Sequence, residues 1–340
     1  MRKMWMRTVL ALAAVAAAGA GCQMFQRMFR PLGGTAALLM SGEEIKEFVG
    51  RSKDPRMYSI TIYEPDKGVP VIVNGNRIRA GQRAIAPFVS PPGSAFPLVR
   101  VRAGATELQA ITDTTAPESW TAMDRRAELG LVPLGPPTQI VQPAHVADPV
   151  DGYLAIIPLF TIDQLNVEAA VFYARASRGP LWPLTRTAVA EKAAAVCGFD
   201  FLRGFASVQW DFSGRVLLLS SSTAYEPDPV RLIASLPFDP TNGVLIVRGE
   251  VGGKPGQVLL DTAGEFEVAL DNPPQGLLRQ ISLGDIVFRQ VQAVPTRQLG
   301  LGRPDLTRVG LRLLSRYLVT MDNRRNLVYF EKPLEAGAAP

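Results

Sequence analysis

The feature that most constrains the fold of this 340-residue chain is an Asp-Thr pair that occurs twice, each time inside a longer recurring segment. Asp113 follows Gly104 by nine residues, and Asp261 follows Gly252 by nine residues. A glutamine stands at the same offset in both segments, and each aspartate ends an apolar run that is typical of a buried strand. The chain therefore contains two related units that each present one aspartate at the end of a strand.

The repeat continues downstream of the two aspartates. Residues 196–202 align with residues 308–314, which places Gly198 opposite Gly310. A further aspartate follows each glycine, after 13 residues in the first unit and 12 in the second. A solenoid unit spans roughly 20–45 residues, and this repeat is longer. We therefore predict a duplicated lobe, with two carboxylates facing each other across an approximate two-fold axis.

Two facing carboxylates suit hydrolysis by an activated water molecule. At about 3 Å two like charges cannot both ionise, so one carboxyl holds a proton as an acid while the other acts as a base. Such a pair needs matched, rigid turns. We expect the hydroxyl groups of Thr114 and Thr262 to bond across to the opposite lobe and to hold both turns.

Both segments resemble the retropepsin and pepsin superfamily of aspartic proteases, whose loop reads Asp-Thr-Gly or Asp-Ser-Gly. Residues 113–119 and the following stretch to Leu131 are similar to bacterial retropepsin-like domains, and the segments at Gly198 and Gly310 resemble the strand that passes behind the loop. The resemblance covers roughly residues 95–219 and 243–332. It implies an all-β, bilobal pepsin-like fold with short helices. It also implies Asp113 and Asp261 as the catalytic dyad, with Thr114, Thr262, Gly198 and Gly310 as supporting residues.

The third loop position departs from the family pattern. It holds Thr115 in the first lobe and Ala263 in the second, where the family has glycine. A Cβ at this position is expected to crowd the approach of a substrate backbone to the carboxylates. Two functions therefore stay open: an aspartic endopeptidase, and a catalytically inactive, protease-like binding or scaffold protein.

The N-terminus has the three-part pattern of an export signal. A basic start and an apolar run too short to span a bilayer lead to Ala-Gly-Cys at Cys22. This ending resembles a bacterial lipobox, which implies lipidation of Cys22 and, with Gln23 next to it, a tether to the periplasmic face of the outer membrane. An ordinary signal peptidase site nearby stays open as the alternative. Cys197 then has no partner for a disulfide, and we expect it to be a buried core residue.

The expected organisation follows the repeat and the positions of proline and glycine. Ser41-Gly42-Glu43-Glu44 is a capping-box pattern that predicts a short helix ending near Gly50. Thr121 is expected to cap a second helix, which Gly130 ends. The predicted segments are a signal peptide (1–21), a tether and N-terminal extension (22–94), the first lobe (95–219), a linker (220–242), the second lobe (243–333) and a tail (334–340).

Composition excludes several other functions. Without Arg2, Lys3 and Arg7 of the leader, the 36 basic residues fall to 33, against 31 acidic ones, so no nucleic-acid surface is indicated. His145 is the single histidine and lies in a proline-rich loop without a nucleophile elbow nearby, which argues against a Ser-His-Asp hydrolase and a zinc site. We expect no cofactor or metal, a peptide or protein substrate, a membrane contact through the lipid, and a monomer.

Overall fold

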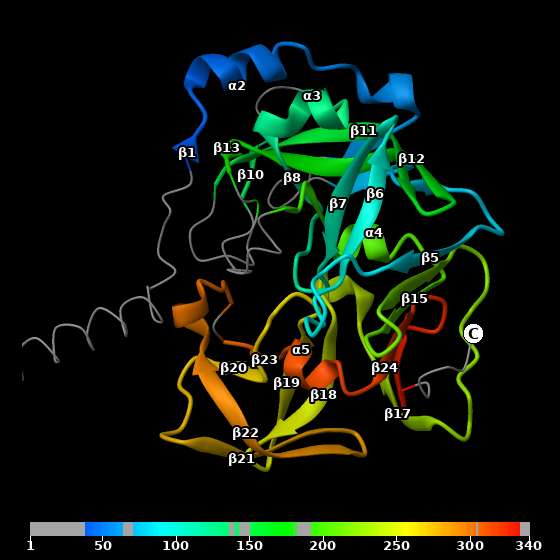
Figure 1. Ribbon diagram of the computed structural model, residues 1–340. Helices are drawn as coiled ribbons and strands as arrows, with labels where there is room; N and C mark the ends of the chain where they lie inside the picture. The colour runs from blue at the N-terminus through cyan, green and yellow to red at the C-terminus, as the bar shows by residue number, and fades with distance from the viewer. Residues whose placement is uncertain are drawn as a thin grey trace, which may run out of the picture. The chain divides into compact units, whose positions relative to one another are not determined.

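The computed structural model describes residues 38–63, 71–135, 140–142, 150–179, 181, 192–303 and 305–333 (Figure 1). All of them belong to one compact unit, Ala37–Pro340. Cys22, His145 and the predicted tail lie outside the described residues.

The first lobe is a closed barrel of six strands. In the order of their pairing, the strands run β11-β6-β7-β14-β8-β12, and β12 pairs with β11 to close the ring. Three short strands, β4, β9 and β10, add to its outside. The strand bounds are β4 (Arg77–Ile78), β6 (Leu98–Ala103), β7 (Thr106–Thr112), β8 (Trp120–Ala122), β9 (Val132–Pro133), β10 (Ile140–Val141), β11 (Gly152–Ile162), β12 (Leu165–Arg175) and β14 (Ala195–Cys197).

The second lobe is a barrel with the same connections. Its strands pair in the order β18-β19-β23-β20-β22-β21 and close. In each barrel four pairings are antiparallel, and the two parallel ones fall at the same places: β7–β14 and β8–β12 in the first, β19–β23 and β20–β22 in the second. The bounds are β18 (Ile246–Val251), β19 (Lys254–Leu260), β20 (Val268–Leu270), β21 (Leu277–Leu283), β22 (Ile286–Pro295) and β23 (Thr307–Val309).

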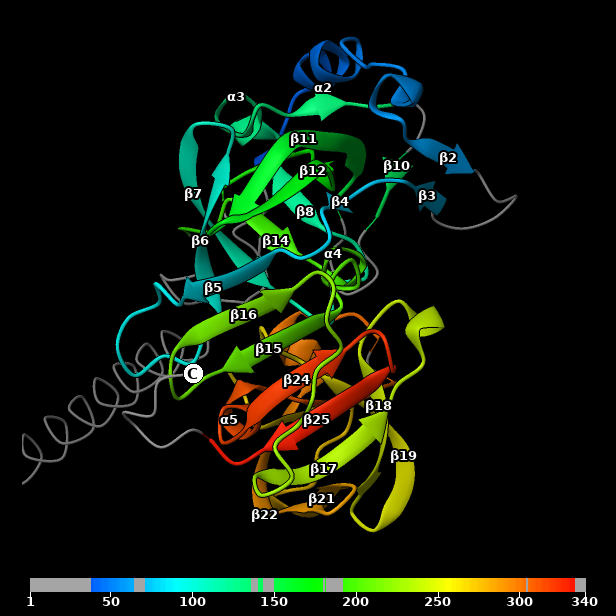
Figure 2. The ribbon, with the colours of Figure 1, turned by 90° about the vertical axis from the view of Figure 1, so that its right-hand side faces the viewer.

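A six-stranded antiparallel sheet joins the two barrels (Figure 2). Its order is β17-β25-β24-β15-β16-β5, so that each half contributes three strands. Gln209 of β15 lies opposite Thr320 of β24, and its Nε2 donates to the Thr320 hydroxyl at 2.8 Å. The register repeats about this pair, which marks the approximate two-fold axis. The bounds are β5 (Arg83–Pro87), β15 (Ser207–Asp211), β16 (Val216–Ser220), β17 (Leu232–Pro237), β24 (Leu318–Asp322) and β25 (Leu327–Glu331).

Two predicted connecting segments contribute strands to this sheet. β5 comes from the N-terminal extension, and its alternating burial turns Ala84 and Ala86 toward the core. β17 comes from the predicted linker and pairs with β25. Both segments are therefore part of the packed unit, because each buries one face against the same core as the barrels.

Short helices cover the barrels. α2 (Gly42–Val49) begins with the predicted capping box: Ser41 and Glu44 satisfy each other's backbone N–H groups. The second predicted helix is different at its start, because Thr121 lies in β8 and its hydroxyl donates to the Ala194 carbonyl, while Gly130 ends the helix as expected. The other elements are β1 (Leu38–Leu39), η1 (Pro55–Tyr58), β2 (Thr61–Tyr63), β3 (Val71–Val73), η2 (Met123–Arg125), α3 (Arg126–Leu129), β13 (Ser177–Arg178), α4 (Phe199–Leu202), η4 (Pro240–Asn242), η5 (Thr296–Leu299) and α5 (Leu311–Leu314).

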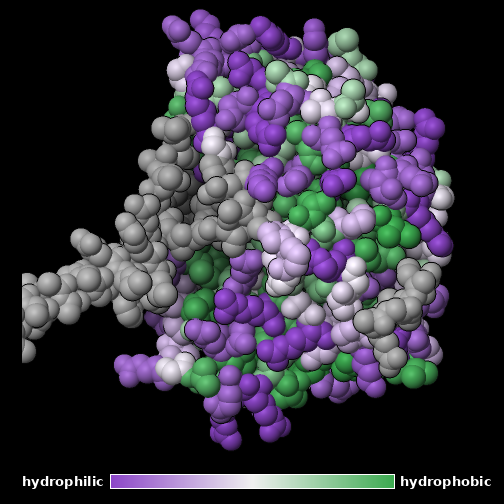
Figure 3. Space-filling view, viewed as in Figure 1, coloured by the Kyte–Doolittle hydropathy of each residue, from purple (hydrophilic) through white to green (hydrophobic). Residues whose placement is uncertain are grey.

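One large hydrophobic core runs through both barrels and the joining sheet, with Trp210 as its largest fully buried side chain. On the face seen in Figure 3, hydrophobic side chains (green) lie in scattered groups between hydrophilic ones (purple). Among the described residues, no helix has the length and apolar character needed to cross a membrane.

Candidate active site

Asp113 and Asp261 occupy equivalent places in the two barrels. Asp113 follows β7 and Asp261 follows β19, and both are buried, with 0% and 2% of their surface exposed. The Asp113 N–H donates to the Cys197 carbonyl at 3.0 Å, and the Asp261 N–H donates to the Val309 carbonyl at 2.9 Å. The strand behind each loop therefore fixes its aspartate in the same way.

Gly198 and Gly310 pass behind the two aspartate loops at very short range. A Cβ on Gly198 would lie 2.4 Å from the Glu118 carbonyl oxygen, and one on Gly310 would lie 2.4 Å from the Phe266 carbonyl oxygen. No real side chain tolerates such a contact, so both positions require glycine because of the close approach of the loop backbone. The structure thus brings together the residues that the repeat aligned.

Thr114 and Thr262 connect the two loops. The Thr114 hydroxyl donates to the Leu260 carbonyl at 2.6 Å, and the Thr262 hydroxyl donates to the Thr112 carbonyl at 3.0 Å. Each backbone N–H also donates to the opposite hydroxyl, at 3.2 and 3.3 Å. The expected bonds between the lobes are therefore present, and they are reciprocal.

Thr115 and Ala263, the third loop positions, hold the two carboxylates differently. Thr115 donates twice to Asp113 Oδ1, from its N–H at 2.8 Å and from its hydroxyl at 2.7 Å. Ala263 donates to Asp261 Oδ1 only from its N–H, at 3.0 Å. The Thr115 side chain therefore does more than occupy space beside the carboxylate, because it also adds a hydrogen bond to it.

Gly264, in the loop of the second lobe, is another position where the backbone lies too close to its neighbours for a side chain. A Cβ there would lie 2.3 Å from the Phe266 ring and 2.9 Å from Asp261 Oδ2. The backbone of Gly264 also helps to lower the pKa of Asp261 by a hydrogen bond. The glycine is needed because the loop runs against its own carboxylate.

Arg308 is a site residue that the sequence reasoning missed. Its Nη1 lies 3.6 Å from Asp261 Oδ2, which is an ion-pair distance rather than a hydrogen bond, and its Nη2 donates to the Gly302 carbonyl at 2.6 Å. Arg308 is completely buried. The repeat could have revealed this residue, because an arginine stands just before the second glycine at the position where the first lobe has Val196.

Burial raises the pKa of both aspartates, and repulsion from Asp261 adds to the rise at Asp113. The pKa of Asp113 is raised to about 7, first by burial and then by the Asp261 charge, while the Thr115 hydrogen bonds and Arg308 oppose the rise. Burial also raises the pKa of Asp261, and Arg308 is the largest opposing influence. The pair therefore holds one proton more readily than two free carboxylates would.

A second acidic pair, the buried Glu118 and the partly buried Asp200, lies behind the loop of the first lobe. Burial, followed by repulsion from Asp200, raises the pKa of Glu118 to about 7, and burial raises the pKa of Asp200 to about 6. Asp200 Oδ1 accepts from the Ser119 hydroxyl at 2.6 Å, and that hydroxyl accepts from the Gly198 N–H at 2.9 Å. Asp200 therefore supports the backbone of the loop through Ser119, and the acidic pair has no counterpart in the second lobe, where Arg312 aligns with Asp200.

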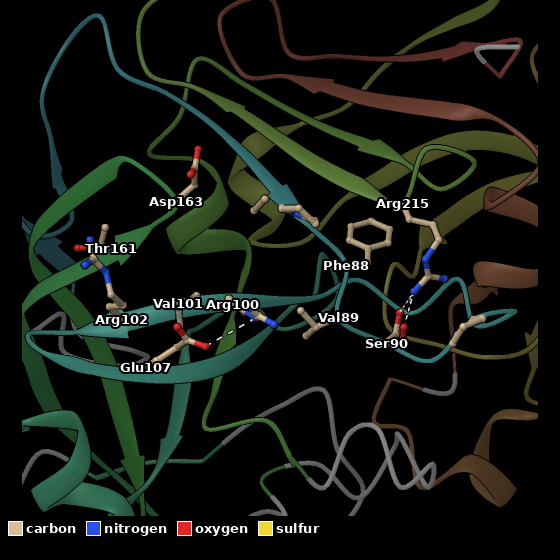
Figure 4. A pocket seen from close by; sticks show the side chains of 13 residues that line it. Phe88, Val89, Ser90, Arg100, Val101, Arg102, Glu107, Thr161, Asp163 and Arg215 are labelled. Atoms are coloured by element: carbon tan, nitrogen blue, oxygen red, sulfur yellow. Dashed lines mark hydrogen bonds and ion pairs between the residues drawn. The ribbon is translucent and has the colours of Figure 1, made fainter. Parts of the chain in front are cut away.

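A cavity of about 700 Å³ lies elsewhere on the first lobe (Figure 4). Three of its charged lining residues have partners: Arg100 lies 3.7 Å from Glu107, and Arg215 donates to backbone carbonyls of residues 90 and 94. Neither Asp113 nor Asp261 lines it. The cavity is therefore separate from the aspartate pair.

The remaining candidates from the sequence are Cys197, a metal site, Cys22 and His145. Cys197 is buried and free, and burial raises the pKa of its thiol. Within the described ranges, no group of three or more histidine, cysteine or acidic residues could hold a metal ion. Cys22 and His145 lie outside the residues that the structure describes, so their predicted roles stay predictions.

Comparison with known proteins found no family model and no curated protein that matches this chain.

Proposed function

We propose that this chain is an aspartic endopeptidase with a pepsin-like fold built from two retropepsin-like lobes, in which Asp113 and Asp261 activate a water molecule. The observation that carries the proposal is the reciprocal bonding of Thr114 and Thr262, which holds two buried aspartates on equivalent loops. Two equivalent turns that faced solvent and had no joint role would not need hydrogen bonds between them. A hydrolytic pair does need them, because the two carboxylates must keep a fixed separation.

The reaction needs one proton on the pair. The ionised carboxylate takes a proton from water as its oxygen attacks the peptide carbonyl carbon, and the protonated carboxyl gives its proton to the carbonyl oxygen. The resulting gem-diol then breaks its C–N bond, the amine nitrogen receives a proton, and one diol hydroxyl returns a proton to the pair. A pKa of about 7 for Asp113 keeps that residue protonated in mildly acidic solution.

The expected pH dependence of cleavage follows from the need for one proton on the pair and from the raised pKa of Asp113. Because the pKa of Asp113 is raised to about 7, cleavage should fall as the pH rises through about 7 and the pair loses its last proton. Cleavage should also fall in strong acid, where both carboxyls are protonated. The activity should therefore be greatest at acidic pH.

The test is cleavage of an unfolded protein, with new peptide ends mapped by mass spectrometry. Asp113→Asn and Asp261→Asn should each lower the rate by at least about 100-fold, the lower end of what general acid–base catalysis supplies. Asp211→Asn is the matched control, because Asp211 is also buried and its carboxylate accepts from the neighbouring Ser213 and Gly214 rather than facing the aspartate pair. Cleavage that persists in Asp113→Asn would refute the proposal.

A binding or scaffold protein is the alternative, and the third loop positions favour it. Thr115 is buried against Asp113 where the family has glycine, and the two carboxylates are almost without exposure. If the side chains only crowd the site, Thr115→Gly together with Ala263→Gly should raise cleavage. If the wild type and this double variant both fail to cleave, a binding protein is favoured.

We also propose export and lipidation at Cys22, with peptide or protein substrates met at the periplasmic face of the outer membrane. The support for this location is the short apolar run that ends in Ala-Gly-Cys.

A further inference from the structure

The approximate symmetry of the two lobes breaks beside the aspartates. The strand behind the first loop carries Val196, whereas the strand behind the second carries Arg308 at the aligned position. Both side chains are fully buried. A positive charge therefore lies next to Asp261, and the equivalent place beside Asp113 has none.

The oxygen atoms of Asp261 all face donors. Oδ1 accepts the Ala263 N–H at 3.0 Å, and Oδ2 lies 3.6 Å from the Arg308 guanidinium. A carboxylate whose two oxygens both face N–H groups is stabilised in its ionised form. Protonation of Asp261 would weaken the Ala263 hydrogen bond and would leave the buried Arg308 charge without its counter-ion.

Asp113 has one oxygen free for a proton. Its Oδ1 accepts both donors of Thr115, whereas its Oδ2 is buried and has no hydrogen-bond partner among the described residues. A buried oxygen without a donor is a poor place for negative charge and a suitable place for a hydroxyl hydrogen. The proton of the pair therefore has one favoured position.

We propose that Arg308 makes the two carboxylates unequal, so that Asp261 is the ionised member and Asp113 carries the proton. Arg308 is a positioning residue in this arrangement, because it acts through Asp261 and needs no contact with substrate. The assignment rests on the proposed function for its chemical meaning: Asp261 is then the base that takes the proton of water, and Asp113 is the acid that protonates the carbonyl oxygen. In the second step the proton on Asp261 passes to the amine nitrogen, and Asp113 regains its proton from the diol.

Four charged groups stand out around the pair. Among the described residues, the largest charge effects on Asp113, Asp261 and Arg308 come from these three residues themselves and from Arg303. The Arg303 side chain is 44% exposed, so solvent screens its charge. Arg308 is therefore the cation that can set the order in which the two aspartates titrate.

The test is a carbon-13 NMR titration of the aspartate carboxyl groups in the full-length protein. Asp113→Asn and Asp261→Asn assign the two signals. In the wild type, Asp261 should titrate at lower pH than Asp113. Arg308→Met, which keeps much of the volume and removes the charge, should raise the titration of Asp261 by about 1–3 pH units. Arg308→Lys keeps the charge and should preserve the order of titration.

Arg303→Met is the matched control, since it removes a nearby but screened charge and should leave the order unchanged. Asp113 titrating below Asp261 in the wild type would overturn the proposal, as would an unchanged Asp261 in Arg308→Met. The wild-type titration decides the order even if Arg308→Met does not fold.

The pH profile of cleavage separates this inference from the proposed function. If the protein cleaves peptides, Arg308→Met should move both limbs of the profile to higher pH, because a positive charge that lowered both pKa values is gone. The expected NMR order without cleavage at any pH would refute the peptidase and keep the assignment. Cleavage together with the reversed NMR order would keep the peptidase and refute the assignment.

Discussion

Replacing Glu118 with glutamine should make the protein less sensitive to alkaline pH. Glu118 is 8% exposed, and its pKa is raised from an ordinary 4.5 to about 7 by burial and by repulsion from Asp200. A carboxyl whose pKa is higher in the folded state stabilises the fold below its unfolded pKa. That stabilisation is lost as the pH rises toward the folded pKa.

The magnitude follows from the same two values. The rise from 4.5 to about 7, at about 1.4 kcal/mol per pH unit, corresponds to about 3 kcal/mol of unfolding free energy lost between about pH 4 and pH 8. Glutamine cannot ionise, so Glu118→Gln should remove this part of the loss. The variant should therefore be more stable than the wild type at about pH 8, and near it or slightly less stable at about pH 4.

The assay is denaturant unfolding of both proteins at the two pH values. Glu107→Gln is the control for the change of acid to amide, because the Glu107 side chain is 64% exposed. The reasoning is refuted if the wild type and Glu118→Gln lose the same free energy between the two pH values. A larger loss in the variant would show that Glu118 is stabilised as a carboxylate.

Two further predictions concern the loops and the N-terminus. Thr114→Val should lower the unfolding free energy by about 2–5 kcal/mol, because it leaves the Leu260 carbonyl and the Thr262 N–H buried without their partner. Denaturant unfolding measures this loss, and Thr121→Val, which removes one bond within a lobe, is the control. A loss in Thr114→Val no larger than that in Thr121→Val would contradict the prediction. Cys22→Ser should release the protein from membranes in cell fractionation without changing its melting temperature, and a variant that still sediments with membranes would count against lipidation.

The sequence was sufficient to predict the duplication and the residues at its centre. Asp113 and Asp261 could be found because the repeat places each at the end of an apolar strand, and the glycines behind them because backbone contact excludes a side chain. The threonine bonds could be predicted because the repeat places a hydroxyl next to each aspartate, within reach of the facing loop. These features depend on local pattern and on symmetry.

Arg308 and the pair Glu118–Asp200 could not be predicted in the same way. An arginine in a strand is usually exposed, and only the folded chain places the Arg308 guanidinium 3.6 Å from the carboxylate of Asp261. Glu118 and Asp200 are far apart in sequence and repel each other because Gly198 passes behind the loop. The burial of these charges depends on contacts between segments that are far apart in the chain, and no short stretch of sequence reveals such contacts.

The strands β5 and β17 could not be predicted from the sequence for a related reason. Each is short, and prolines mark its surroundings as a loop. β5 pairs with β16 across a separation of about 130 residues, as the register of Ala86 with Leu217 shows. Pairing of this kind is decided by the joining sheet and not by the intrinsic preference of the segment.

The measurement that tests the central claim most directly is peptide cleavage in water enriched in oxygen-18. Direct attack by water on the carbonyl carbon should place one heavy oxygen in the new carboxyl group of the product. After one turnover, mass spectrometry should find none in the side chains of Asp113 and Asp261. Heavy oxygen entering one of these aspartates first would indicate a covalent intermediate, and a wild type that yields no product in acidic or neutral solution would contradict the account.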